Sequence, residues 1–436
     1  MLSGLHRNQS FVMKLMGLAT TILATIAPSK ALLSPCPNVL DAVVRYNTAP
    51  GWSYVKVAGG LQRPRDLIFD SQGRLLIVQE GVGLSQHLVD ANGCVTNTRI
   101  LISKADLNHG LCLSADGYTL FASSSSTVFR WNYDPTTGDV GPNPVVVVSG
   151  MATSGHTSRT LIIPPHRQDL LVVSHGSNSN IDQAAGDPKT ARAIVKVFNV
   201  SSVPTGGYKY ASQGWNAGFG LRNEVGLAFD GNNMLWGVEN SADNLARTIN
   251  GTTTDVHTDN PSEELNFLGD VTVANDKWYG YPVCFTVWRP DEFSDHAFQV
   301  GQQFVQVPTP SFNDDTCSRL SVPPALSFQA HSAPLGCKFD SKFTNLFVTF
   351  HGSWNRQPPT GYKVVAVPFA QDPDGSYAPE AASWSTRGSI DVFYPRDETQ
   401  CSSSNCLRPV GLMFDAAGRL YVTSDASGEL FLLSQG

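Results

Sequence analysis

A histidine and several arginines stand directly before short apolar runs in this sequence, where they are suited to acid–base chemistry and anion binding. In "SGHTSRTLIIPP", His156 and Arg159 precede one such run. A histidine can accept a proton near neutral pH, and guanidinium groups pair with carboxylates or phosphates through two parallel hydrogen bonds. Comparable residues precede five further runs: Arg63 and Arg65, Asn108 and His109, Arg222 and Asn223, His331 and Ser332, and Arg408.

The apolar runs belong to a unit that recurs six times along the chain. Each copy has polar residues, four or five apolar residues, a turn rich in Asp, Gly, Asn or Ser, and a second apolar run, as in "RDLIFDSQGRLLIVQE" and "VGLMFDAAGRLYVTSD". This pattern predicts a β-hairpin, and the amphipathic periodicity of helices is missing. The copies align at Asp66, Gly110, Thr160, Gly226, Gly336 and Gly411.

Six hairpin units arranged in a ring predict an all-β fold, a six-bladed β-propeller, which leaves few strand edges exposed. The long interval between the fourth and fifth copies is expected to hold an insertion. In a propeller the starts of the inner strands meet at one end of the central channel. We therefore expect the polar residues that precede the apolar runs to form an anion-binding funnel at that end.

Charge and the first residues of the chain narrow the setting. The formal net charge of -7 offers no basic face for nucleic acid. The apolar stretch "LMGLATTILATIA" followed by "PSKA" predicts a signal peptide over residues 1–31, and no later segment is apolar enough to span a membrane. We expect a secreted, extracellular protein whose propeller domain covers residues 32–436.

The eight cysteines fit an oxidising compartment. Their placement predicts three disulfides, Cys36–Cys94, Cys284–Cys317 and Cys401–Cys406. Cys112 and Cys337 lie inside apolar runs and are expected to be buried free thiols. "NVS" at Asn199 and "NGT" at Asn250 are acceptor sequences for N-glycosylation, so we expect a glycoprotein.

Several stretches, in order, resemble one enzyme family: "GHTSRTLII", "GFGLRNEVGLAFD", "EELNFL" with "WYGYP", "HSAPLG", "FHGSWNR" with "GYKVV", and "LRPVGLMFD". They are similar to the soluble PQQ-dependent sugar dehydrogenases, in particular the sorbosone dehydrogenase-like and fungal pyranose dehydrogenase branch. The resemblance implies that His156 takes the proton of the anomeric hydroxyl while hydride passes to PQQ. It also implies that Arg222 stabilises the reduced quinone, with Asn223 beside it, and that Arg408 holds a PQQ carboxylate.

A calcium ion that polarises PQQ is implied at the main-chain carbonyls of Asn240 and Ser241. The glucose-oxidising bacterial members have Gln-Gly-Pro where this chain has "ENS", so the carboxylate of Glu239 is a further candidate for this calcium site. Glu264, in "EELN", matches a carboxylate of a second, structural calcium site in the family.

The anion pocket departs from the family pattern at two positions. The family's cofactor lysine falls at Asn355, which leaves Arg356 as the nearest basic residue, and its second carboxylate-binding arginine falls at Cys406. Arg65 or Lys338 is the expected replacement. The full set of cofactor-binding residues that we expect is Arg65, Asn108, His109, Arg159, Asn223, His331, Arg356 and Arg408.

Two other function classes also fit a propeller: a calcium-dependent lactonase-type hydrolase and a non-catalytic binding module. The lactonase needs carboxylates and amides that surround a metal in the channel, whereas the expected funnel is richer in arginine. The resemblance implies a pyranose sugar or keto-aldose as substrate and an external electron acceptor, with a haem b cytochrome as one candidate. We expect a monomer. His351, before "GSWNR", is a candidate for contact with the substrate.

Overall fold

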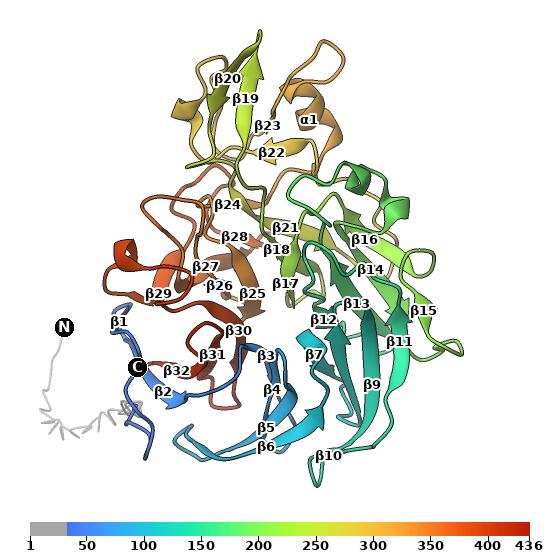
Figure 1. Cartoon of the computed structure of the whole chain (residues 1–436), viewed down its shortest axis with the longest axis vertical. Helices are drawn as coiled ribbons and strands as arrows, with labels where there is room; N and C mark the ends of the chain where they lie inside the picture. The colour runs from blue at the N-terminus through green and yellow to red at the C-terminus, as the bar shows by residue number, and fades with distance from the viewer. Residues whose placement is uncertain (1–32) are drawn as a thin grey trace, which may run out of the picture. The chain divides into compact units, whose positions relative to one another are not determined.

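Six β-sheets lie around a common centre in the computed structural model, which describes residues 33–436 (Figure 1). The predicted signal peptide lies outside the described residues. The innermost strand of each blade contains or directly follows one of the six aligned positions, which confirms the six-bladed propeller. These inner strands are β3 (Pro64–Phe69), β7 (Leu107–Leu113), β12 (Leu161–Ile162), β17 (Glu224–Phe229), β25 (Pro334–Phe339) and β30 (Pro409–Phe414).

The first three blades follow the chain in order. Blade 1 adds β4 (Leu75–Gln79), β5 (Gly83–Val89) and β6 (Val95–Ser103) to β3. Blade 2 adds β8 (Thr119–Ser124), β9 (Thr127–Asp134) and β11 (Val145–Ser149) to β7, with β10 (Asp139–Val140) and β15 (Tyr208–Lys209) at its margin. Blade 3 adds β13 (Leu170–His175), β14 (Ile194–Asn199) and β16 (Trp215–Phe219) to β12.

The last three blades include strands from distant parts of the chain. Blade 4 adds β18 (Leu235–Glu239), β21 (Glu263–Gly269) and β24 (Leu326–Phe328) to β17. Blade 5 adds β26 (Asn345–Phe350), β27 (Lys363–Gln371), β29 (Ile390–Pro395) and the early strand β1 (Tyr46–Thr48), with β28 (Tyr377–Pro379) paired to β27. Blade 6 adds β31 (Leu420–Ser424), β32 (Glu429–Gln435) and β2 (Trp52–Ala58) to β30, which closes the ring.

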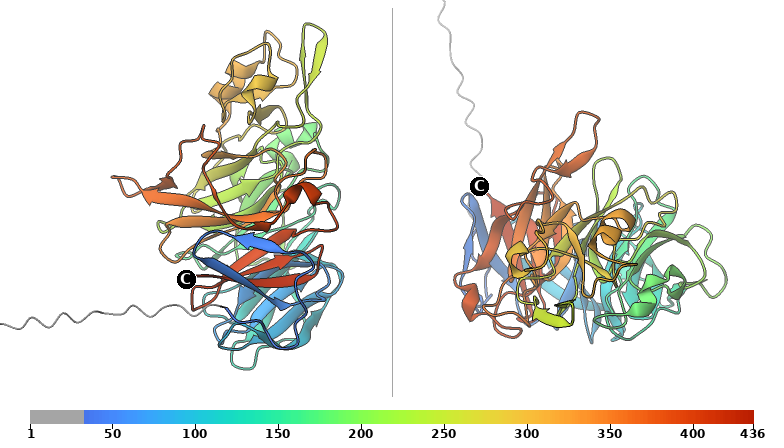
Figure 2. Two further views of the ribbon diagram at one scale, coloured as in Figure 1. Left: turned by 90° about the vertical axis from the view of Figure 1, so that its left-hand side faces the viewer. Right: turned by 90° about the horizontal axis from the view of Figure 1, so that it is seen from above.

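The predicted insertion lies within blade 4, between β18 and β24. It holds the hairpin β19 (Ala246–Ile249) and β20 (Thr252–Asp255), the pair β22 (Cys284–Thr286) and β23 (Gln303–Val305), and α1 (Asp314–Leu320). Figures 1 and 2 show these elements as a lobe at the rim of the propeller. Among residues 33–436, no helix is long and apolar enough to cross a membrane.

An aspartate fixes the hairpin turn in several blades. Asp70 Oδ1 accepts the backbone N–H groups of Gln72 and Arg74 at 2.9 and 2.8 Å. The residue between them, Gly73, has a φ of 76°, which glycine adopts without steric cost. The same pair of hydrogen bonds recurs at Asp230, Asp340 and Asp415. These side chains explain why "D-x-x-G"-like turns mark the repeats.

Hydroxyl groups join neighbouring blades at the aligned glycines. Thr423 Oγ1 accepts the N–H of Gly411 at 2.9 Å and donates to the carbonyl oxygen of Arg65 in blade 1 at 2.7 Å. Ser123 and Thr349 make the same connection for blades 2 and 5. A side chain at the aligned position would overlap the neighbouring carbonyl, because a Cβ at residue 411 would lie 2.5 Å from the Arg65 oxygen.

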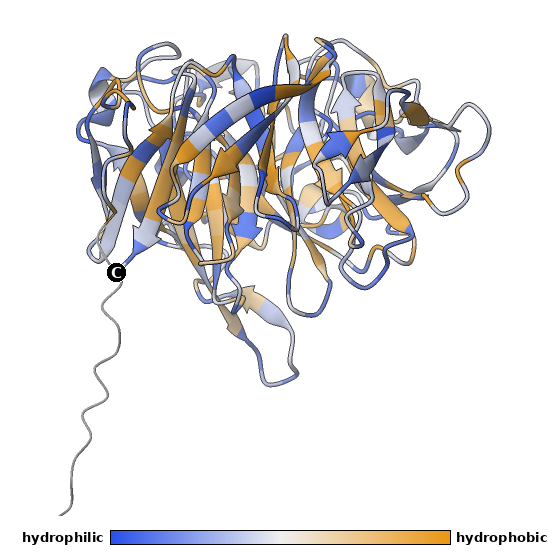
Figure 3. Ribbon diagram, turned by 90° about the horizontal axis from the view of Figure 1, so that it is seen from below, coloured by the Kyte–Doolittle hydropathy of each residue, from blue (hydrophilic) through white to orange (hydrophobic). Residues whose placement is uncertain are grey.

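Apolar side chains fill the spaces between blades, and the loops carry most of the polar residues. One such layer contains Val348 and Val365 of blade 5 with Val238 and Leu265 of blade 4, all fully buried. In Figure 3 the hydrophobic residues concentrate along the strands, and the connecting loops are largely hydrophilic. The core therefore lies between the sheets, which holds the channel ends in place.

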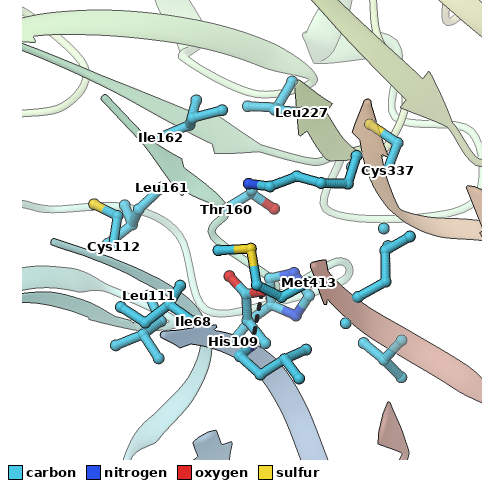
Figure 4. A pocket seen from close by; sticks show the side chains of 18 of the residues that line it. Ile68, His109, Leu111, Cys112, Thr160, Leu161, Ile162, Leu227, Cys337 and Met413 are labelled. Atoms are coloured by element: carbon cyan, nitrogen blue, oxygen red, sulfur yellow. Dashed lines mark hydrogen bonds between the residues drawn. The ribbon is translucent and has the colours of Figure 1, made fainter. Parts of the chain in front are cut away.

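The predicted cysteine pairing is confirmed. Disulfides join Cys36 to Cys94, Cys284 to Cys317 and Cys401 to Cys406, and within residues 33–436 Cys112 and Cys337 are free and buried. Both free thiols line an inner cavity of about 260 Å³ formed by the six inner strands. Figure 4 shows Cys112 and Cys337 on opposite sides of this cavity.

Candidate functional site

A polar pocket of about 180 Å³ lies where the loops before four inner strands meet the loops that follow β18 and β26. The strand pairing explains the meeting, because Glu224 pairs with Glu239 and Pro334 with Phe350, so each inner strand begins where its neighbour ends. The lining includes His156, Arg222, Asn223, Asn240, Ser241, Asp243, Glu263, His331, His351, Trp354, Asn355 and Arg408.

The hydrogen bonds around His156 show which of its two ring nitrogens carries the proton. Its Nδ1 lies 3.1 Å from the carbonyl oxygen and 3.0 Å from the hydroxyl oxygen of Ser177. The carbonyl can only accept, and the Ser177 hydroxyl donates its own hydrogen to the Ser179 carbonyl at 2.8 Å. Nδ1 therefore carries the proton, and Nε2 is left as a proton acceptor. Burial and the charge of Arg222 lower the pKa of His156 to about 4, so the ring is neutral.

Arg222 uses its whole guanidinium group to bind two loops, the one after β18 and the one after β13 that contains Asn180. Nη1 donates to the carbonyl oxygens of Asn240, at 3.2 Å, and Ser241. Nη2 donates to Asn180 Oδ1 at 2.8 Å and Asp243 Oδ2 at 3.2 Å, and Nε donates to the Asn180 carbonyl at 3.1 Å. The two predicted metal-ligating carbonyls therefore converge on one cationic nitrogen.

The carboxylates of Asp243 and Glu263 and the ring of His331 also line the pocket. His331 Nε2 donates to the carbonyl oxygen of His257 at 2.5 Å, and Nδ1 lies 3.6 Å from Asp243 Oδ1. Burial alone would lower the pKa of His331, but its interaction with the accepting Asp243 carboxylate and the charge of Glu263 raise it. Burial raises the pKa of Glu263 to about 7, although its Oε2 accepts the N–H of Ser241 at 2.6 Å.

Arg408 and Asn355 bring polar atoms to the pocket that no other group satisfies. Nη2 of Arg408 donates to His351 Nδ1 at 2.8 Å. Within the described part of the chain, Arg408 Nη1 and both Asn355 side-chain polar atoms are buried without a hydrogen-bond partner. Buried polar groups are normally paired, so these atoms point to a polar ligand. Arg408 Nη1 and Asn355 Nδ2 can donate hydrogen bonds to oxygen atoms of such a ligand.

Five of the eight predicted cofactor-binding residues lie away from the pocket lining. Arg159 is fully buried and donates to the carbonyls of its own loop, at His156, Ser158 and Ala152. Asn108 Nδ2 donates to the Thr157 carbonyl at 3.0 Å. Arg159 and Asn108 thus shape the His156 loop, and neither is among the lining residues of the pocket.

Arg65, His109 and Arg356 are also paired elsewhere. Arg65 Nη1 lies 2.6 Å from Asp425 Oδ2, and its Nη2 lies 3.4 Å from His109 Nδ1. Arg356 Nη2 donates to Asp259 at 2.7 Å. Lys338, the other proposed replacement, lines the inner cavity with His109 (Figure 4 labels the latter). The position of the family's lysine, Asn355, does line the pocket.

Glu264 belongs to a separate, buried group of carboxyls with Glu224 and Glu239. Asn266 Nδ2 donates to Glu224 Oε2 at 3.2 Å and Glu239 Oε2 at 3.0 Å. Burial raises the pKa of Glu264 to about 7, and it raises those of Glu224 and Glu239 well above the ordinary value. Side chains alternate along β21, so Glu263 reaches Ser241 whereas Glu264 does not. Within residues 33–436, no three His, Cys, Asp or Glu side chains are grouped to hold a metal ion.

Two lining residues were not expected from the sequence. Asp243 lies in the loop after β18, and Glu263 is the first residue of β21, the strand that pairs with β18. Both lie in blade 4 beyond its inner strand, so a search confined to the residues before inner strands misses them. The signal for Asp243 was its place three residues after the predicted carbonyl ligand Asn240.

Comparison with known proteins gives one consistent family. The family model described as TrAA12-like matches residues 46–436. The pyrroloquinoline quinone-dependent pyranose dehydrogenase of Coprinopsis cinerea is 40% identical over 407 residues, which are 92% of this chain and 56% of that protein. This chain thus spans little more than half of that relative.

Solved structures agree in fold. The holo form of the pyranose dehydrogenase PQQ domain from Coprinopsis cinerea has a TM-score of 0.89 at 40% identity, covering 92% of this chain and 99% of that chain. The calcium structure of Trichoderma reesei Carbohydrate-Active Enzymes Family AA12 has a TM-score of 0.86 at 37% identity, covering 92% and 100%. The likeness extends over nearly all described residues.

Proposed function

Because this chain belongs to the TrAA12-like family, we propose that it is an oxidoreductase acting on the anomeric carbon of a pyranose sugar, with PQQ and Ca²⁺ as cofactors. One observation carries the proposal. The pocket places a neutral histidine with a free Nε2 beside two arginines, one of which has a buried, unpaired nitrogen among the described residues. A base next to an anion site is what sugar oxidation with an anionic quinone requires.

The pocket fits PQQ in charge and in donor chemistry. PQQ is a planar quinone with several carboxylates, and guanidinium groups bind such anions well. Arg408 would hold a carboxylate through Nη1, and Asn355 would donate to a quinone or carboxylate oxygen. Burial would lower the pKa of His331, but Asp243 and Glu263 raise it, so they favour the protonated form of this ring beside a bound anion.

The carbonyl oxygens of Asn240 and Ser241 suit calcium, which prefers oxygen ligands. They already converge on a positive charge, Arg222 Nη1. Calcium at these oxygens would require that nitrogen to withdraw, and Arg222 would then be free to face the bound quinone. The assignment of Glu264 to a second calcium ion stays a proposal, which rests on the match of "EELN" to the family pattern.

When bound, PQQ supplies the two-electron oxidant, and calcium draws electron density from it. The chain supplies the remaining functions. His156 Nε2 accepts the proton of the anomeric hydroxyl, and Ser177 keeps Nδ1 protonated while the ring gains charge. Arg222 and Arg408 supply positive charge for the reduced quinone and its carboxylates. Trp354, 66% exposed at the pocket, offers an aromatic face to a sugar ring.

Electrons then leave to an external acceptor. A haem b cytochrome is one candidate partner, and we propose a monomer that acts outside the cell after removal of residues 1–31. Three disulfides support an oxidising compartment.

The test is an absorption spectrum. Protein freed of metal with a chelator is incubated with PQQ and Ca²⁺, separated from free PQQ, and mixed with pyranose aldoses, starting with D-glucose. We expect the bound quinone spectrum to change to that of the reduced form with at least one sugar. Arg408→Ala should lose PQQ on separation, whereas His156→Ala should retain it unreduced. Failure of the parent protein to bind PQQ, or hydrolysis of a lactone by the calcium form without PQQ, would overturn the proposal in favour of a hydrolase or binding module.

A further inference from the structure

Four charged or polar side chains form a continuous series of contacts, and two of them, His351 and Arg408, line the pocket. Arg408 Nη2 lies 2.8 Å from His351 Nδ1, and His351 Nε2 lies 2.8 Å from Asp425 Oδ1. The other carboxylate oxygen, Asp425 Oδ2, lies 2.6 Å from Arg65 Nη1. These contacts join three blades. Arg65 is in β3 of blade 1, His351 directly follows β26 of blade 5, and Arg408 and Asp425 flank strands of blade 6.

The direction of each hydrogen bond can be assigned from chemistry. Arginine nitrogens only donate, so His351 Nδ1 must accept from Arg408. The single proton of the neutral ring is then on Nε2, which donates to Asp425. The Asp425 carboxylate accepts from both His351 and Arg65. No other arrangement satisfies all three contacts at once.

The charges of the groups support this arrangement. Burial lowers the pKa of His351, which keeps the ring neutral. Burial alone would raise the pKa of Asp425, but its contact with His351 and the charges of Arg65 and Arg408 hold it well below the ordinary value. Asp425 is therefore ionised and balances Arg65, while the Arg408 charge remains available to the pocket.

We infer that Asp425 is a positioning residue for the anion site: it holds His351 in the Nε2–H form, and this ring holds the Arg408 guanidinium against the pocket. The inference rests on the proposed function for the identity of the anion, PQQ. Neither His351 nor Asp425 needs to touch the cofactor for this role. The position of the proton on His351 does not depend on that identity and can be measured separately.

Replacement of Asp425 by asparagine is expected to move the ring proton of His351, while the side chain at residue 425 keeps nearly the same shape. The amide can donate its Nδ2 hydrogen to His351 Nε2, which moves the ring proton to Nδ1. That proton then faces a nitrogen of Arg408 that also carries hydrogens, so the two donors repel and the guanidinium leaves its place. Loss of the correct tautomer is a known consequence of such a change in a buried Asp–His pair.

The matched control is Asp415→Asn. Asp415 pairs with Arg419 at 2.7 Å and lies in the hairpin turn of the same blade, outside the pocket lining. Both variants remove one blade 6 carboxylate that accepts from an arginine, Arg65 for Asp425 and Arg419 for Asp415. A general loss of stability would therefore affect both, whereas loss of the anion site would affect Asp425→Asn alone.

The experiment has two independent measurements. The dissociation constant for PQQ is measured in the presence of Ca²⁺ by titration of the metal-freed protein. Asp425→Asn is expected to weaken binding by about 10-fold to 100-fold, as for other supporting residues of bound groups, and Asp415→Asn by less than about 3-fold. The ¹⁵N shifts of labelled His351, assigned by their loss in His351→Gln, are expected to report Nε2–H in the parent protein and in Asp415→Asn.

An Nδ1–H form or an imidazolium at His351 in the parent protein overturns the inference, and this measurement needs neither PQQ nor a folded Asp425→Asn variant. Equal PQQ affinity in the parent and Asp425→Asn, or equal losses in the two asparagine variants, also overturns it. If the parent protein does not bind PQQ at all, the proposed function fails, and the ¹⁵N shifts alone decide the tautomer.

Discussion

The backbone and hydroxyl of Ser177 hold the ring of His156 from one side, with Nδ1 at 3.1 Å from the carbonyl oxygen and 3.0 Å from Oγ. The carbonyl contact depends only on the backbone, since Ser177 N–H in turn donates to the Arg222 carbonyl at 2.7 Å. The base is therefore fixed by the same segment that positions Arg222. Its orientation does not require a carboxylate partner.

His156→Ala is expected to lower turnover by about 10²- to 10⁴-fold, the usual contribution of a general base. PQQ binding should stay within a few-fold of the parent, because Arg408 and calcium hold the cofactor. Steady-state kinetics with a dye acceptor and a PQQ titration measure the two effects. Ser177→Ala is the control, and its loss should be much smaller because the carbonyl acceptor remains. A His156→Ala enzyme that oxidises sugar near the parent rate contradicts the role of this residue.

The pH dependence of sugar oxidation follows from the pKa of His156, which burial and Arg222 lower to about 4. A lowered pKa means that the ring stays neutral to lower pH, and only the neutral ring can accept a proton. We expect kcat/KM to hold its value through pH 6.5 and to fall as the pH decreases through about 4. A decrease near pH 7 that Glu263→Gln removes would report Glu263, whose pKa burial raises to about 7. A decrease near 6.5 that persists in that variant contradicts the prediction.

Gly411→Ala is expected to destabilise the fold by about 1–3 kcal/mol, the usual cost of overpacking. The new Cβ would lie 2.5 Å from the carbonyl oxygen of Arg65, across the junction between blades 6 and 1. Gly141→Ala is the control, since the nearest atom to its Cβ would be at 3.6 Å. Chemical unfolding followed by tryptophan fluorescence gives both values, and equal stability of the two variants would show that the close approach is not needed.

Loss of the Cys36–Cys94 disulfide should cost more stability than loss of Cys401–Cys406. The two bonds span 58 and 5 residues, and the loop-entropy model gives about 4 and about 2 kcal/mol for such spans. The paired Cys→Ser variants are compared by urea unfolding under identical conditions. A larger loss of stability for the Cys401–Cys406 variant would contradict the prediction that Cys36–Cys94 stabilises the fold mainly by restricting the unfolded chain.

The blades were predictable because their signals are local: an aspartate turn such as Asp70–Gly73, and a glycine where a neighbouring carbonyl approaches. The pocket was predictable only in part. His156, Arg222 and Arg408 reach the expected end of the channel, but Arg159 turns back to its own loop carbonyls. The sequence indicates where the backbone of a residue lies in the blade. The direction of its side chain depends on the folded loop and on the partners that it meets there.

The expected role of Arg65 shows the same limit. Arg65 lies at the start of the first inner strand, but its charge is paired with that of Asp425, 360 residues later in the sequence. No local pattern indicates a pair at that separation. His351 was expected to contact substrate, but both of its ring nitrogens form hydrogen bonds within the protein, Nδ1 with Arg408 and Nε2 with Asp425.

Blade 6 is built from β2 and from β30 to β32, so its sheet is assembled from segments near residues 52–58 and 409–435. During synthesis, residues 52–58 emerge long before their partners, and their strand edge must wait without pairing. Pairing between segments so distant in sequence is slow, and an exposed strand edge favours aggregation while it lasts. Arg408 and Asp425 arrive with the same late segment. Newly made chains should therefore acquire the anion site last, in the step that ends the exposure of β2.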